Sequence, residues 1–164
     1  MDTTLDSAVL HLARARLADL TRQIDTCLRL LSDQQIWWRP NERANAIGNL
    51  VLHLCGSNRF HIGRGLGGLE FTRDRDAEFA ERTPRPGAEL VGRLAAVMKE
   101  CDEVLERLPA GRLMDTTDRT GKQTTYVQIV LHVVSHVAVH TGQIVYITKL
   151  LQEGAIDELW RTTQ

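Results

Sequence analysis

Four segments of this chain place an apolar residue at every third or fourth position, and this spacing restricts the fold more than any other feature of the sequence. It is the period of an α-helix that buries one face. Three of the segments lie near residues 46–63, 87–108 and 126–154. Strand-like alternation never lasts more than a few residues, so we predict an all-α fold with four helices. The apolar positions of the first segment, about eight turns long, are Leu5, Val9, Leu12, Leu17, Leu20, Ile24, Leu28 and Leu31.

Residues that favour helix ends stand at the borders of these segments. Asn45 is in the right place to be the N-cap of the second helix. Pro109 and Gly111 follow the third helix and end it. Thr125 and Gln128 have the spacing of a capping box at the start of the fourth helix.

The connection between the second and third helices, from about residue 64 to 86, is the longest one. Fully extended it would reach roughly 70 Å, more than twice the length of a 20-residue helix. Helices two and three can therefore run parallel, while the shorter links suit antiparallel neighbours. We predict a single domain over residues 1–164, a four-helix bundle in up-down-down-up order with one long crossover. The crossover segment "RDRDAEFAER" is strongly charged, and we predict a solvated surface segment there.

Charge and cysteine usage exclude several classes of function. Lys and Arg number 20 against 21 Asp and Glu, giving a formal charge of −1, so no long-range field would attract a nucleic acid. No uninterrupted apolar run reaches the roughly 20 residues of a membrane helix, and the first residues lack signal-peptide order. We therefore expect a cytoplasmic protein without nucleic-acid or membrane partners. Cys27, Cys55 and Cys101 form no CxxC pair and are expected to be reduced core residues.

The fourth helix carries three of the six histidines, in "HVVSHVAVHTGQI". His132, His136 and His140 are each four residues apart, so their side chains lie over one another on one helix face. Two of them could bind one metal ion together with His53, which lies in an apolar stretch of the second helix. Spacing alone does not say which adjacent pair binds, nor whether the histidines bind metal or only pack. His11 and His61 are expected to be ordinary histidines.

Three stretches carry a resemblance to a known family. "LSDQQIWWRPNERANAIGNLVLHLCGSNR", "RDRDAEFAER" and "HVVSHVAVHTGQIVYITKLL" resemble the DinB-like superfamily in this order and at similar separations, over nearly the whole chain. They are closest to a branch of largely uncharacterised proteins. The resemblance implies a metal-binding four-helix bundle whose metal ligands fall on His53, His136 and His140, with His132 outside the set. Ser135 departs from the family pattern, in which this position is often acidic.

Other residues are placed to line the same neighbourhood. Asn49 lies one turn before His53, and Gln143 lies three residues after His140, so both are candidate partners of the metal-binding imidazoles. His132 is a third pocket candidate. Trp37 and Trp38 form either a plug at the end of the bundle or a wall of the pocket.

The resemblance also implies a kind of chemistry. Characterised DinB-like relatives include bacillithiol S-transferases and mycothiol-dependent maleylpyruvate isomerases. We therefore expect a divalent metal ion, zinc or nickel first, with iron, copper or manganese as alternatives, and a low-molecular-weight thiol as cosubstrate. The expected function is a metal-dependent thiol S-transferase acting on a small electrophile. The alternative is a non-catalytic metal-binding bundle with a structural or stress-response role. A homodimer is expected, and no catalytic residue is assigned.

Overall fold

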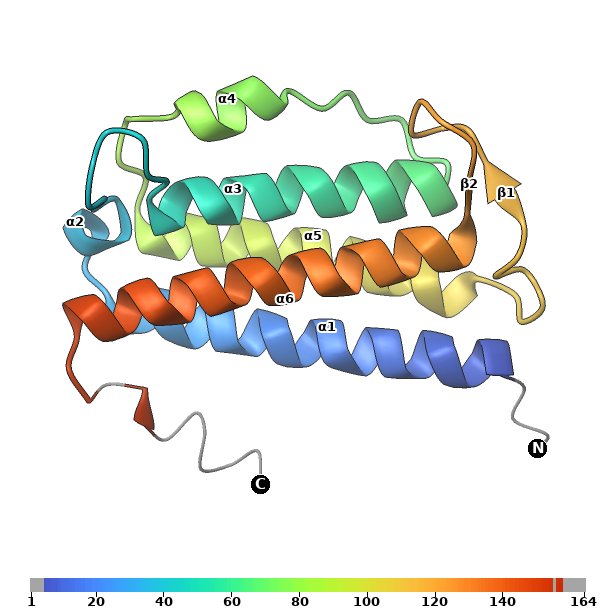
Figure 1. Ribbon diagram of the computed structural model, residues 1–164, viewed down its shortest axis with the longest axis horizontal. Coiled ribbons are helices and arrows are strands. Elements are labelled where there is room, and N and C mark those ends of the chain that lie inside the picture. The colour runs from blue at the N-terminus through green and yellow to red at the C-terminus, as the bar shows by residue number, and fades with distance from the viewer. Residues whose placement is uncertain (1–4, 155, 158–164) are drawn as a thin grey trace.

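The structure, a computed structural model, describes residues 5–154 and 156–157. Four long helices, α1 (Leu5–Leu30), α3 (Ile47–Asn58), α5 (Gly87–Arg107) and α6 (Tyr126–Leu151), form a bundle (Figure 1). A π-helical segment, η1 (Arg59–Leu66), continues α3 by two turns. α1 and α6 run in one direction, whereas α3 and α5 run in the other (Figure 1). The predicted all-α bundle with up-down-down-up order is confirmed.

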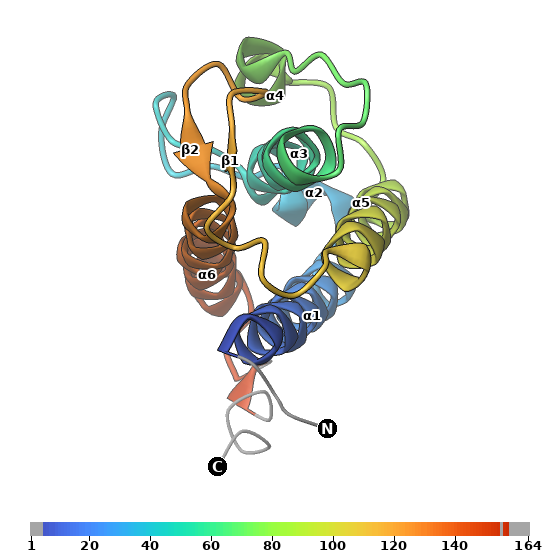
Figure 2. The same ribbon diagram turned by 90° about the vertical axis from the view of Figure 1, so that its right-hand side faces the viewer.

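Seen from one end, the bundle is a square of helices (Figure 2). α1 and α3 occupy opposite corners, and α5 and α6 occupy the other two, so that α3 contacts both α5 and α6. The largest fully buried side chains include one or more from each corner: Ile24, Leu54, Leu90 and Ile144. The fourth helix can therefore present one face to α3 while another face packs on α1.

Short elements close the ends of the bundle. α2 (Asp33–Ile36) links α1 to α3, and a two-stranded antiparallel hairpin of β1 (Thr116–Thr117) and β2 (Thr124–Thr125) leads into α6. α4 (Arg75–Ala80) lies in the long crossover and covers the outer side of α3 (Figure 1). Trp37, just after α2, is buried and donates its Nε1 hydrogen to the Arg85 carbonyl at 3.0 Å, so it plugs this end.

Two details of the predicted helix ends differ from the structure. The N-cap of α3 is Ala46 and not Asn45, because the Asn49 side-chain oxygen accepts a hydrogen bond from the Ala46 N–H at 3.3 Å. The end of α6 is Leu151, three residues before Gly154. The predicted capping box of Thr125 and Gln128 is confirmed.

Most residues of the crossover segment 73–82 are exposed, as its charge predicts, but the charged side chains of Glu78 and Arg73 are not. Glu78 of α4 is buried, with a side chain only 9% exposed, and Arg73 just before α4 is 13% exposed. Both turn inward because Asp74 caps α4, its carboxylate accepting from the Ala77 N–H at 2.9 Å, which fixes the helix over α3.

α6 is long and apolar enough to cross a membrane, by length and composition alone. In the bundle, its Val133, Val137 and Ile144 are buried, and the helix packs on both α1 and α3. The exposed side of α6 carries four large apolar side chains, Leu131, Val139, Tyr146 and Leu150. Its apolar composition thus serves the core on one face and leaves a second apolar face at the surface.

Candidate metal centre

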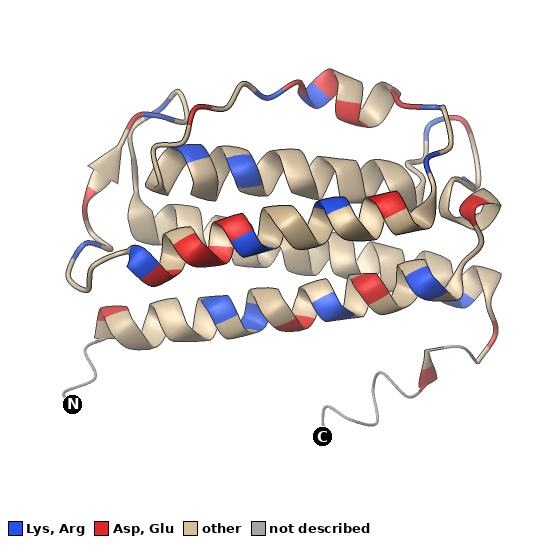
Figure 3. Ribbon diagram, turned by 180° about the vertical axis from the view of Figure 1, so that it is seen from behind, with Lys and Arg blue, Asp and Glu red and all other residues tan. Residues whose placement is uncertain are grey.

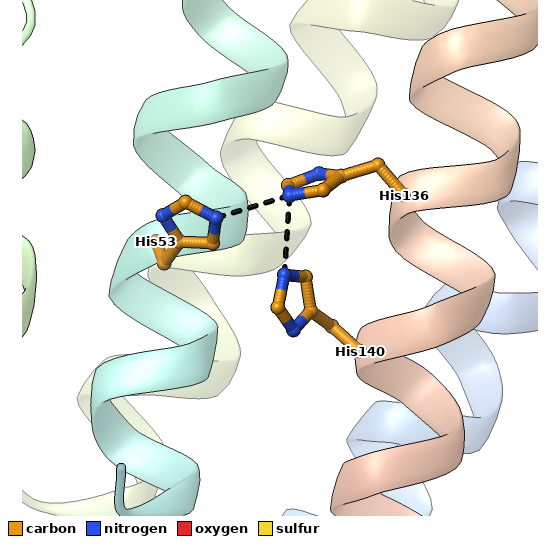
Figure 4. Close-up of side chains that lie close together, drawn as sticks. All are labelled: His53, His136 and His140. Atoms are coloured by element: carbon orange, nitrogen blue, oxygen red, sulfur yellow. Dashed lines mark hydrogen bonds between the residues drawn. The ribbon is translucent and has the colours of Figure 1, made fainter. Parts of the chain in front are cut away.

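Three imidazoles converge between α3 and α6 (Figure 4). His53 projects from α3 and meets His136 and His140, which lie one turn apart on α6. The Nε2 atom of His136 lies 3.0 Å from that of His53 and 3.1 Å from that of His140. Two nitrogens bound tetrahedrally to one zinc ion at 2.0–2.1 Å would be about 3.3 Å apart. The three histidines are therefore positioned to hold a metal ion.

Oxygen acceptors on the far side of two rings set the tautomers that a metal requires. The Nδ1 of His53 lies 2.9 Å from Glu78 Oε2, and the Nδ1 of His140 lies 2.7 Å from Gln143 Oε1. Each Nδ1 therefore carries the hydrogen and donates it, leaving the Nε2 lone pair free to bind an ion. The Nδ1 of His136 is buried without a hydrogen-bond partner among the described residues.

Glu78 is itself held by Arg73. The Arg73 guanidinium donates to Glu78 Oε1 through Nε and to Oε2 through an NH2 group, both at 2.8 Å. Such a two-point ion pair fixes the carboxylate plane as well as its position. The same NH2 group lies 3.0 Å from His53 Nδ1, because both groups donate to one Glu78 oxygen. Arg73, Glu78 and His53 therefore form one buried chain of contacts.

Gly56 of α3 makes the space for this carboxylate. A Cβ atom at this position would lie 1.8 Å from Glu78 Oε1, far inside any allowed contact. Glycine in a helix interior is about 1 kcal/mol less favourable than alanine, so its presence here needs a reason. The reason is that Glu78 can reach His53 only where α3 has no side chain.

Burial keeps the imidazoles of His53 and His136 neutral. It lowers the pKa of His53, more strongly than the hydrogen bond to Glu78 raises it. Burial also lowers the pKa of His136 to about 3, and the nearby imidazoles of His140 and His53 lower it further. Since a metal ion binds only the unprotonated ring, both side chains are in the binding form at neutral pH.

Comparison with known proteins shows the family of the chain. Residues 5–162 match the model of the family described as "Protein of unknown function (DUF1572)". The chain belongs to this family. No curated protein matches it.

Two solved structures have a fold similar to that of this DUF1572 chain. One is a DinB-like protein from Bacillus cereus ATCC 10987, with a TM-score of 0.66 at 15% identity, covering 82% of this chain and 87% of that one. The other is a conserved protein from Enterococcus faecalis, with a TM-score of 0.69 at 15% identity, covering 85% and 95%. These neighbours show that the chain has the fold of a DinB-like protein.

Of the residues expected to line the pocket of the DUF1572 chain, one contacts the triad through a hydrogen bond and two do not. Gln143 accepts the hydrogen bond from His140. Asn49 does not reach the triad: its side-chain amide donates to the Glu78 and Glu81 carbonyls, each at 3.1 Å, and so holds α4 against α3. His132 lies outside the triad, with its ring stacked on His136 at a centroid distance of 5.5 Å and edge-on to His61 at 4.7 Å.

Arg73 and Glu78 contact the candidate site, and reasoning from residue types alone missed them. Their charge suggests solvent exposure, and a carboxylate 25 residues from His53 gives no periodic signal. Two signals were available. The segment "RDRDAEFAER" is part of the DinB-like resemblance, and its Phe79 is an apolar residue in a charged run. Phe79 packs against His53 at a ring-centroid distance of 4.5 Å.

The cysteines do not provide a nucleophile. All three are buried, and burial raises the pKa of Cys55 and of Cys101 to about 12. Burial also raises the pKa of Cys27. A thiol is reactive as its thiolate, so these side chains are unreactive at neutral pH.

Proposed function

We propose that this protein is a divalent-metal-dependent enzyme of the low-molecular-weight-thiol S-transferase type, acting on a small electrophile. The observation that supports it best is a ligand set of three histidines from two helices. Among the described residues, no Cys, Asp, Glu or further His joins that group, and His132 stays outside it. Three protein ligands with free coordination positions are typical of catalytic centres, whereas structural zinc sites have four.

When bound, a divalent ion would lower the pKa of a thiol or water and act as a Lewis acid. The chain itself positions the ligands. Glu78 and Gln143 fix the rings of His53 and His140, and α4 shields the His53 side from solvent. Because the cysteines are buried and protonated, the nucleophilic sulfur is expected to come from a soluble thiol. No residue of the chain is assigned as acid or base.

The activity test compares metal-loaded protein with two histidine variants. Purified without a metal-affinity tag, the protein is mixed with cysteine or glutathione and 1-chloro-2,4-dinitrobenzene, whose ring carbon bonds to sulfur as chloride leaves and the thiol proton passes to solvent. We expect thioether formation above background that is lost in His136→Ala and kept in His132→Ala. Metal-loaded protein that binds its ion but is no faster than His136→Ala, with these thiols and with the bacillithiol and mycothiol classes, would favour the non-catalytic metal-binding bundle.

The proposal also covers the metal ion, the location and the partners of the enzyme. We propose zinc or nickel as the ion, since imidazole suits both, with iron, copper or manganese as alternatives. A cytoplasmic location and a small-molecule substrate, without nucleic-acid or membrane partners, belong to the same proposal. The homodimer stays a prediction, for which the molar mass in solution is the measurement.

A further inference from the structure

One hollow of the molecule, of about 450 Å³, has a lining rich in arginine. η1, the connection before α4 and the hairpin between β1 and β2 form its walls. Figure 3 shows basic and acidic residues interleaved along these segments. Among the described residues that line it none is acidic, and its arginines and aromatic residues are Arg64, Arg73, Arg75, Arg119, Phe60 and Phe71.

Three of these four guanidinium groups have no carboxylate partner within the described part of the chain. Arg64 donates to two carbonyls, those of Arg119 and Phe71, each at 2.9 Å. Arg75 lies over the Phe79 ring at 4.9 Å, which leaves its hydrogen-bonding edge free. The Arg119 guanidinium makes no hydrogen bond or ion pair with a described residue. Only Arg73 is paired, with Glu78.

What distinguishes these arginines is that they line one hollow. Elsewhere, Arg14, Arg29, Arg59, Arg85 and Arg112 form ion pairs with carboxylates, whereas the described Arg39, Arg43, Arg82 and Arg93 do not. Guanidinium groups that converge on one hollow repel each other unless an anion lies between them. Their fixed fork geometry matches carboxylate and phosphate oxygens. The volume lies within the range of small-molecule sites.

Arg73 connects the hollow to the metal centre. Its guanidinium lines the hollow, bonds Glu78 and lies 3.0 Å from His53 Nδ1. A ligand held by the arginines would therefore lie one side chain away from a metal-binding imidazole. The two aromatic rings in the wall offer an apolar surface to the rest of such a ligand.

We propose that this hollow binds a small anion with two or more oxyanion groups, carboxylate or phosphate, on the Nδ1 side of His53, away from the metal-binding Nε2. This binding does not rest on the proposed function. The experiment is accordingly a binding measurement on metal-free protein, which also prevents the anions from acting as metal chelators.

Isothermal titration calorimetry with citrate and with pyrophosphate separates the two oxyanion types, and acetate at matched ionic strength is the monovalent control. We expect citrate or pyrophosphate to bind in a one-to-one ratio, and acetate to bind far more weakly. Arg119→Gln should weaken the binding about tenfold or more, because a charge-assisted contact is lost. This variant is chosen because the Arg119 side chain has no described partner whose loss would disturb the fold.

Two further variants make the result specific. Arg43→Gln removes an exposed arginine outside the hollow and should leave binding within about twofold of wild type. His140→Ala removes a triad histidine that does not contact Arg73, so this variant should lose metal binding but keep anion binding. Binding by neither anion, or equal weakening in Arg43→Gln and Arg119→Gln, would overturn the proposal. Anion binding with no metal binding would leave this site standing and remove the proposed function.

Discussion

The two helices that supply the triad hold their histidines in different ways. On α3, His53 is 5% exposed and lies within a buried chain of contacts with Glu78 and Arg73. On α6, His136 and His140 are half-buried. The partner of His140 is an exposed glutamine of the same helix, and His136 Nδ1 has none among the described residues.

The two helices therefore contribute to metal binding in different ways. On α3, tertiary contacts from the crossover already orient the His53 ring, so no further free energy is needed to orient it when an ion binds. The α6 side contributes two of the three ligands, but depends on helix spacing alone to bring them together. We therefore expect substitutions on α6 to act mainly by removing a metal ligand, and substitutions on the α3 side to act mainly by disturbing the orientation of His53.

The largest effect is expected when α6 loses a ligand. His136→Ala leaves two imidazoles, and near-stoichiometric metal in the wild type should fall to background. Elemental mass spectrometry of protein purified without a metal-affinity tag measures this. His132→Ala is the matched control, one turn away on the same helix, and should keep its metal. An equal loss of metal in both variants would mean that His132 is also a ligand and that the set of three histidines is incomplete.

A smaller effect is expected from Glu78→Gln on the α3 side. It keeps the ligands but removes the charged acceptor of His53, which should weaken metal affinity about 10- to 100-fold. It also leaves the buried Arg73 unpaired, so the unfolding free energy should fall by about 3 kcal/mol. Competition with a chelating dye and urea unfolding measure the two quantities.

Gly56→Ala gives a second way to displace the same carboxylate. The new methyl group would occupy the place of Glu78 Oε1, so metal affinity should fall as in Glu78→Gln although every polar side chain is retained. An unchanged affinity in both variants would show that the α3 side does not orient His53 and would remove the contrast between the helices.

The sequence predicts features that depend on neighbouring residues, but not those that depend on contacts between distant parts of the chain. The helices, the parallel pair and the capping box at Thr125 follow from local spacing and loop length. The helical period places His132, His136 and His140 on one face and makes His53 a candidate partner, but the pair His136 and His140 was chosen by resemblance. The burial of Glu78 was missed because it depends on tertiary contacts: Asn49 holding α4, Arg73 neutralising the charge, and Gly56 leaving space. None of these has a periodic signal.

A still smaller effect is expected on the α6 side from Gln143→Ala. The Gln143 oxygen is an exposed acceptor, so water can replace it, and metal affinity should fall by about tenfold or less. The unfolding free energy should stay within about 0.5 kcal/mol of wild type, unlike in Glu78→Gln. The same two measurements apply. A loss as large as that of Glu78→Gln would show that both helices orient their ligands equally.

The smallest effect concerns the next turn of the same two helices, where His61 of η1 meets His132 of α6. Burial lowers the pKa of His61 to about 4. Between pH 6.5 and about 4 the unfolded chain therefore binds a proton at His61 that the folded chain does not, and stability falls as the pH falls. His53 and His136, whose pKa values are also lowered, add to the same slope. In chelator-treated protein, His61→Phe should keep the ring contact but reduce the loss of Tm between pH 7 and pH 4 by roughly 5 °C. If the slope is unchanged, His61 is protonated equally in both states, and the burial that keeps His53 and His136 neutral does not extend to this turn.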